Sequence, residues 1–260
     1  ADTGDKVTIT GENFGTDPSD ISVSFNGTPA EFELVDESTI VATTPADYKT
    51  GNVTVTIHGY TMTGSAMFNP NSKGDVTVLY LQNYKQPFAK ANDESWKNGE
   101  WWTPAVWNQN AASFNAKGNT TVSGMQYKSE EGLTLAFQNG WDKEAYTNGK
   151  MWQVATLRHG KYRLEVTYAY TLVVTDAGNF ISVLIAKGDS ESDIPNVADL
   201  EQLNGVYVVY DKMGTANDSG TLVTPSFEVT ETTDVVIGFL TSLAKGNSYF
   251  RVTELKLILE

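Results

Sequence analysis

Short stretches of alternating apolar and polar residues recur along the whole chain, and this is the period of a β-strand with one buried face. They are rich in β-branched and aromatic side chains, and glycine, asparagine, aspartate or proline separates them at intervals of about eight to twelve residues. The pattern predicts an all-β protein. The clearest stretches are Lys6–Thr10, Ile21–Gly27, Asn52–Gly59, Asp75–Leu81, Lys161–Tyr170 and Phe250–Leu259.

One stretch departs from the strand pattern. Asn196–Leu203 follows Pro195 and is closed by Asn204–Gly205, which are start and stop signals of a short helix. We expect one helical turn within a loop there.

A polar stretch, Phe68–Asp75, interrupts the strand pattern with proline, asparagine, serine and glycine. All six tryptophans lie beyond it, between Trp96 and Trp152. The sequence therefore predicts two domains, residues 1–70 and 75–260.

Composition narrows the classes of function. The 260 residues carry 18 Lys and Arg against 32 Asp and Glu, a net charge of −14, which argues against sequence-independent binding of nucleic acid. Lys and Arg are nowhere clustered as an anionic lipid surface requires. The absence of cysteine excludes disulfides and thiolate chemistry, and His58 and His159 are too far apart in sequence for a histidine metal motif. We expect surface or turn roles for both histidines.

No apolar run approaches the roughly 20 residues that cross a bilayer. The opening residues, ADTGDK, have neither the basic nor the apolar region of a signal peptide. We expect the chain to be a mature or trimmed product of a longer one.

The first segment has well-defined turn signals. Asn26–Gly27 predicts a type I′ hairpin turn, Gly11, Asn13 and Gly15 suit tight turns, and Phe14 suits a plug between two sheets. A phosphate-binding loop at Gly11–Gly15 would need a helix after it, and a strand-rich segment follows instead.

The order of these motifs resembles the IPT/TIG family of immunoglobulin-like domains. GDKVTITGENFG (4–15) is a strand running into GxNFG, ISVSFNGTPAEFELVDESTIVATTP (21–45) contains a strand ending in NG and another ending at T-P, and GNVTVTIHG (51–59) is a closing strand. The resemblance covers residues 3–69 and implies an N-terminal immunoglobulin-like β-sandwich.

The second segment resembles galactose-binding-like jelly-roll modules of glycan-handling proteins. In NGKMWQVATLRHGKYRLEVTYAY (148–170), a strand leads to Leu157, a turn to Gly160, and Tyr162 opens the next strand. With an IPT/TIG module in front, this looks like surface glycan-binding lipoproteins of Bacteroidetes. The resemblance implies a C-terminal jelly-roll β-sandwich, a secreted or outward-facing outer-membrane protein, a lipid anchor that this chain lacks, and outer-membrane uptake components as partners.

Asp93–Asn110 holds four tryptophans among polar residues and has neither helical nor strand period, so we expect a long loop. Exposed indoles in such a loop can stack on the apolar faces of sugar rings, while nearby polar groups bond the hydroxyls. The expected carbohydrate-binding residues are Trp96, Trp101, Trp102, Trp141, Asn139, Asp142 and Lys143.

Two tryptophans are expected in the core: Trp152, within a strand, and Trp107, at a strand entry. Trp101 and Trp102 are adjacent, so in extended backbone they point to opposite faces and at least one points outward.

No catalytic motif is present, and the acidic pairs Glu130–Glu131 and Asp142–Glu144 suit solvated loops. No cofactor is required, although a structural calcium ion has two candidate loops, Asn92–Glu94 and Asp211 with Asn217 and Asp218. These features favour the hypothesis that the protein binds a polysaccharide or oligosaccharide without catalysis. The alternatives are an adhesion protein that binds a protein through the tryptophan loop, and a glycoside hydrolase.

Overall fold

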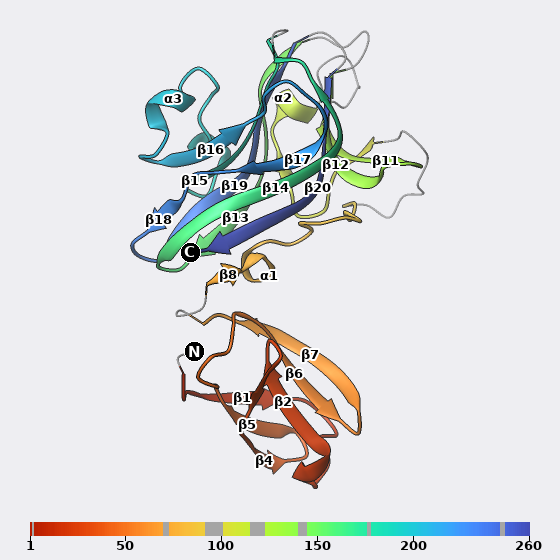
Figure 1. Ribbon diagram of the computed structural model, residues 1–260, viewed down its shortest axis with the longest axis vertical. Helices are drawn as coiled ribbons and strands as arrows, with labels where there is room; N and C mark the ends of the chain where they lie inside the picture. Colours follow the sequence, from red (N-terminus) through yellow and green to blue (C-terminus); the bar gives the residue numbers. More distant parts are fainter. Residues whose placement is uncertain are drawn as a thin grey trace. The chain divides into compact units, whose positions relative to one another are not determined.

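The computed structural model describes residues 1, 3–69, 73–91, 101–114, 123–139, 145–175, 178–244 and 248–260. The chain divides into two compact units, Ala1–Leu79 with Leu259–Glu260, and Tyr80–Ile258. Both are built from antiparallel β-sheets, so the predicted all-β class is confirmed (Figure 1). No helix in the described part of the chain has the length and hydropathy needed to cross a lipid bilayer.

The smaller unit is an immunoglobulin-like sandwich of two sheets. One sheet has the order β1 (Lys6–Thr10), β5 (Thr39–Thr43) and β4 (Phe32–Asp36). The other has the order β3 (Thr28–Ala30), β2 (Ile21–Phe25), β6 (Gly51–Ile57) and β7 (Tyr60–Met67), and η1 (Pro18–Asp20) leads into β2. Alternate residues of these strands fill a core that includes Phe14, Val23, Phe25, Ile40 and Tyr48.

Two turn predictions for this unit are confirmed. Asn26 and Gly27 have φ values of 45° and 83°, the two positive values that a type I′ turn between β2 and β3 requires. Phe14 is buried, and a Cβ at Gly11 would lie 2.5 Å from the tip of its ring. Glycine at position 11 therefore makes room for the plug.

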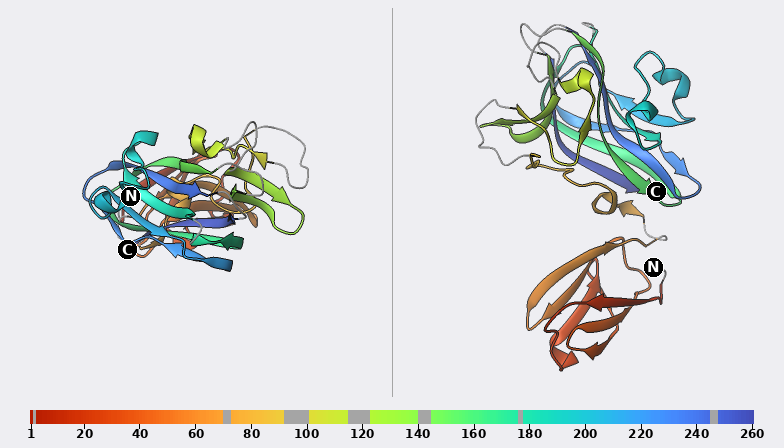
Figure 2. Two further views of the ribbon diagram at one scale, coloured as in Figure 1. Left: turned by 90° about the horizontal axis from the view of Figure 1, so that it is seen from above. Right: turned by 180° about the vertical axis from the view of Figure 1, so that it is seen from behind.

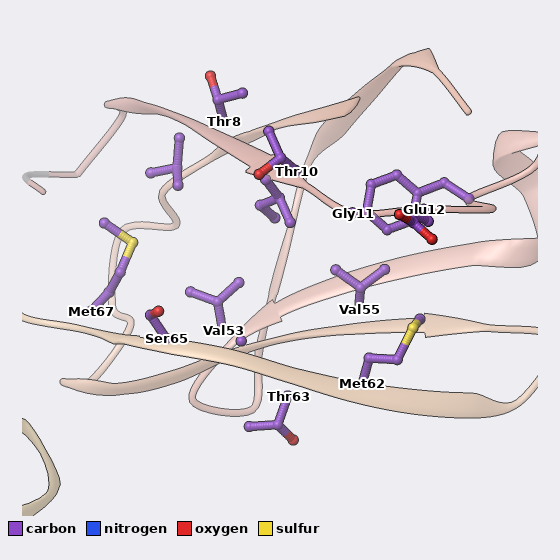
Figure 3. A pocket seen from close by; sticks show the side chains of 14 residues that line it. Thr8, Thr10, Gly11, Glu12, Val53, Val55, Met62, Thr63, Ser65 and Met67 are labelled. Carbon is purple, nitrogen blue, oxygen red and sulfur yellow. The ribbon is translucent and has the colours of Figure 1, made fainter. Parts of the chain in front are cut away.

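A cleft of about 520 Å³ opens between β1 and strands β6 and β7 of the smaller unit. Figure 3 shows Val53 and Val55 projecting into it, with Met67 near one end and Glu12 near the other. Its lining is mainly aliphatic and threonine side chains, and it contains no tryptophan.

The larger unit pairs a five-stranded sheet with a larger sheet. The five-stranded sheet has the order β10 (Asn108–Gln109), β13 (Tyr146–Leu157), β19 (Thr233–Leu243), β15 (Phe180–Lys187) and β16 (Val208–Lys212). The larger sheet has the order β17 (Ala216–Val223), β14 (Gly160–Val173), β20 (Ser248–Leu259), β12 (Gly132–Asn139), β11 (Ser123–Lys128) and β9 (Trp101–Trp102), and β18 (Phe227–Val229) also pairs with β14.

Aromatic side chains fill the space between these two sheets. Phe239 of β19 lies 4.9 Å from Phe137 of β12 and 6.4 Å from Phe250 of β20, measured between ring centroids. Trp107 packs on the same Phe239 at 5.7 Å, and its indole N–H donates to the carbonyl of Asn83. The expected core role of Trp107 is confirmed.

A second core lies on the other face of the five-stranded sheet. Trp152 of β13 packs there with Leu184 and Val236 against the segment that contains Ile194 and Leu200. That segment includes η3 (Glu191–Asp193) and α3 (Leu200–Leu203), which lies next to β16 in both views (Figures 1 and 2). The expected core role of Trp152 and the expected helical turn are confirmed, although the helix is shorter than Asn196–Leu203.

One predicted strand is wrong. Within Asp75–Leu81, only Asp75 belongs to a strand, β8 (Gly74–Asp75), and α1 (Thr77–Tyr80) follows. The Asp75 carboxylate accepts from the backbone N–H and from the hydroxyl of Thr77, at 2.9 and 2.5 Å. This side-chain cap favours a turn over the alternating pattern. One further short helix, α2 (Ala111–Phe114), follows β10.

Candidate functional site

The outer face of the larger sheet, the face turned away from the five-stranded sheet, is defined by strand alternation. Phe137 and Phe250 point into the core, so their neighbours in sequence point outward. Gln138 of β12 therefore lies on the outer face, together with Tyr249 and Arg251 of β20.

Trp101 and Trp102 of β9 point to opposite faces. Trp102 is paired with Met125, which is fully buried, and Trp102 itself is 6% exposed. Trp101 is paired with Gln126 on the outer face and is partly exposed. The pair thus places one indole in the core and one on the outer face.

Arg251 joins the aromatic side chains of this face. Its guanidinium carbon lies 6.0 Å from the centre of the Trp101 ring and 5.2 Å from that of Tyr249. Ala136 pairs with Arg251 across the sheet, so a small side chain leaves room for the buried guanidinium. Both rings therefore contact one cation and belong to one surface.

The guanidinium is fully buried and hydrogen-bonded. Nε donates to Glu131 at 3.0 Å and Nη2 donates to the side-chain amide oxygen Oε1 of Gln138 at 2.7 Å, whereas Nη1 has no partner among the described residues. Burial lowers the pKa of Arg251, and the adjacent Glu131 carboxylate opposes this shift.

Glu131 is shared by two cations. Its other oxygen lies 3.4 Å from Lys128 Nζ, which in turn lies 5.7 Å from the centre of the Tyr249 ring. The interpretation of Glu131 as a solvated loop charge is therefore wrong, because its side chain is only 13% exposed and holds an ion pair. The sequence could not reveal this, because Arg251 lies 120 positions away.

A cavity of about 410 Å³ adjoins Tyr249 on the same sheet. Its lining includes Tyr170 and Thr171 of β14 and three polar residues of β17, namely Asn217, Asp218 and Ser219. Tyr170 is 51% exposed. Aromatic and polar groups thus extend from Trp101 on β9 to Asp218 on β17.

Two of the expected ligand residues do not lie on this surface. Trp102 packs in the core, and Asn139 is fully buried, with its side-chain amide donating to the carbonyls of Leu243 and Ala244. The expectation that they contact a ligand does not fit these positions, because both point inward with Phe137. Trp96, Trp141, Asp142 and Lys143 lie outside the described residues.

The calcium candidates receive no support from the described residues, in which no group of three or more His, Cys, Asp or Glu side chains could hold a metal ion. Asp211 accepts from the backbone N–H groups of Lys212 and Val223, both at 2.9 Å. Asn92–Glu94 lie outside the described residues. His58 Nδ1 lies 3.4 Å from the Asp20 carboxylate at the surface, and His159 is exposed.

The sequence analysis missed Tyr170, Tyr249 and Arg251. A signal for the last two is present, because Phe250 and Val252 are apolar and an alternating strand must place Tyr249 and Arg251 on the opposite face. Pairing with Trp101 through the sheet is a long-range property that alternation does not determine.

Models of two domain families match the chain. The IPT/TIG domain matches residues 1–73, so the resemblance of the first segment is confirmed. A domain of unknown function, DUF5013, matches residues 82–238, which is more than half of the chain. The chain belongs to the DUF5013 family. No curated protein sequence matches it.

Several solved structures resemble this chain at low sequence identity. The carbohydrate-binding module TmCBM61, in complex with β-1,4-galactotriose, is 11% identical, covers 60% of this chain and 90% of its own, and has a TM-score of 0.35. SGBP-B from a xyloglucan utilization locus of Bacteroides uniformis is 14% identical, covers 99% of this chain and 70% of its own, and has a TM-score of 0.29. The xylan-binding module CBM15 is 13% identical, covers 59% of this chain and 96% of its own, and has a TM-score of 0.32. Similarities of this size do not determine a ligand.

Proposed function

We propose that the DUF5013 protein binds carbohydrate, without catalysis, on the outer face of its larger sheet. The observation that carries the proposal is the pair of partly exposed rings, Trp101 and Tyr249, that contact the guanidinium of Arg251. Because the guanidinium is buried and hydrogen-bonded, it holds both rings in place before a ligand arrives.

Sugar rings suit such a surface. Each presents an apolar C–H face, and covering roughly 50 Å² of it on one aromatic ring contributes about 1–2 kcal/mol. Two rings on one surface allow one oligosaccharide to gain this contribution twice. Lys128 lies beside Tyr249 and can donate to hydroxyl groups.

In this proposal, the two units have different roles. The IPT/TIG unit serves as a spacer, because the described part of it contains neither a tryptophan platform nor a polar aromatic pocket. The larger unit carries the ligand site. In the cell, the protein is a surface-exposed outer-membrane lipoprotein that passes a polysaccharide to uptake components.

Affinity electrophoresis against a panel of polysaccharides tests the proposal. The chain should be retarded in gels that contain at least one of them, and it should release no reducing sugar from any. Release of reducing sugar would instead show a hydrolase. Retention by none, with capture of a defined protein from host extracts, would show an adhesion protein and overturn the proposal.

A further inference from the structure

A bulge in β14 turns a tyrosine outward beside the cavity described above. Tyr168 pairs with Gly220 and Thr171 with Asp218, so two residues of β14 oppose one residue of β17. Within the bulge, Tyr170 has a φ of 50°, a left-handed conformation that is uncommon for a bulky residue. Its side chain is nevertheless 51% exposed, so burial does not account for this conformation. Outliers of this kind cluster at ligand sites.

The cavity has the chemistry of a site for a small polar ring. Tyr170 and Tyr249 provide aromatic surface, and Asn217 and Ser219, which share one face of β17, provide hydrogen-bonding groups. Its volume of about 410 Å³ falls in the range of small-molecule sites. Tyr249 also contacts Arg251, so the cavity continues the surface that begins at Trp101.

The charge at this end of the surface is negative. Asp218 is the charged group among the described residues that line the cavity, whereas Lys128 and Arg251, which contact Tyr249, are both paired with Glu131. Burial raises the pKa of the neighbouring Tyr168, and the carboxylates of Asp211 and Asp218 raise it further. The nearby Asp218 charge would repel a carboxylate on a ligand, whereas uncharged hydroxyl groups meet no such repulsion.

We propose that the cavity is a subsite for one uncharged sugar ring, which stacks on Tyr170 and forms hydroxyl hydrogen bonds with Asn217 and Ser219. This inference rests on the proposed function and adds a second contact region, at the β14–β17 end, to the Trp101 region. It also assigns a ligand class, a neutral glycan in preference to one built from uronic acids.

Isothermal titration calorimetry on the full chain tests the subsite. The probes are neutral xylo- and galacto-oligosaccharides, and oligogalacturonides of the same lengths. Wild type should bind a neutral probe, and Tyr170→Ala should bind it about tenfold more weakly because one stacking surface is lost. Asn217→Ala should also weaken binding. Asp218→Asn should reduce the discrimination against oligogalacturonides. Tyr207→Ala, at a similarly exposed tyrosine outside the cavity, is the matched control.

The outcomes separate this inference from the proposed function. If Trp101→Ala loses affinity while Tyr170→Ala, Asn217→Ala and Asp218→Asn bind as wild type, the subsite is wrong and the proposed function stands. If oligogalacturonides bind more tightly than neutral probes, the assigned ligand class is wrong. If wild type binds no probe in the calorimeter and no polysaccharide in the gels, the subsite and the proposed function are both wrong.

Discussion

Arg251 and Glu131 form an ion pair in which Nε of the fully buried guanidinium donates to Oε2 of the carboxylate at 3.0 Å. Lys128 approaches the other carboxylate oxygen at 3.4 Å. One acidic side chain therefore pairs with two cations beside the Tyr249 ring, and the position of the rings depends on a charge from a turn between β11 and β12.

Replacing Glu131 by Gln should destabilise the larger unit by about 3 kcal/mol, because it leaves the buried guanidinium without its counter-charge. Urea unfolding followed by tryptophan fluorescence measures this. Glu130→Gln, at the exposed neighbouring position, is the control and should be neutral. Equal stability of the two variants would mean that the ion pair contributes little.

Replacing Gly27 by Val should destabilise the smaller unit by more than about 1 kcal/mol, because the type I′ turn holds this residue at a φ of 83°. A Cβ there would meet no atom within 4 Å, so the cost arises from the backbone alone. Gly214 has equally open space without a positive φ, and Gly214→Val serves as the control. An unchanged melting temperature of Gly27→Val would refute the strain argument.

The Asp193 carboxylate organises the segment that covers Trp152, because it accepts from the backbone N–H groups of Asp189 and Ser190 and from the Ser190 hydroxyl. These hydrogen bonds, that of the Ser190 side chain first, lower the pKa of Asp193 from its ordinary value. A lowered folded-state pKa stabilises the fold above the unfolded value, and this contribution is lost as the pH falls through the folded value.

Asp193→Asn should therefore reduce stability at neutral pH and have a smaller effect near pH 3. Unfolding by urea at the two pH values, beside the exposed Asp189→Asn as a control, measures the difference. An identical loss at both pH values would show that the charge of Asp193 has no part in the cap.

The two units should fold separately, because each has its own buried core. A chain cut between residues 70 and 75 should give a soluble C-terminal piece with the circular dichroism of strands and a cooperative melting transition. Aggregation of that piece would show that the units depend on a shared core.

Local signals predicted much of the fold. Alternation gave the bounds of β1 as Lys6–Thr10, and the Asn26–Gly27 pair gave the hairpin, since both depend on residues close in sequence. The strand expected at Asp75–Leu81 failed because one side-chain cap outweighed alternation. Part of the candidate site could be predicted from the sequence, because adjacent residues of a strand point to opposite faces, and this separates Trp101 from Trp102. The contact of Trp101 with Arg251 could not be predicted, because it arises from the order of strands in the sheet and joins residues 150 positions apart.

The central claim is that Trp101 and Tyr249 form a carbohydrate-binding surface, and retention of single variants in a polysaccharide gel tests it most directly. Trp101→Ala and Tyr249→Ala should each lose about tenfold in affinity with the melting temperature preserved. Tyr207→Ala should bind as wild type. Trp152→Ala should be destabilised by about 3–5 kcal/mol and, while folded, should still bind. Wild-type retention of both Trp101→Ala and Tyr249→Ala would contradict the account.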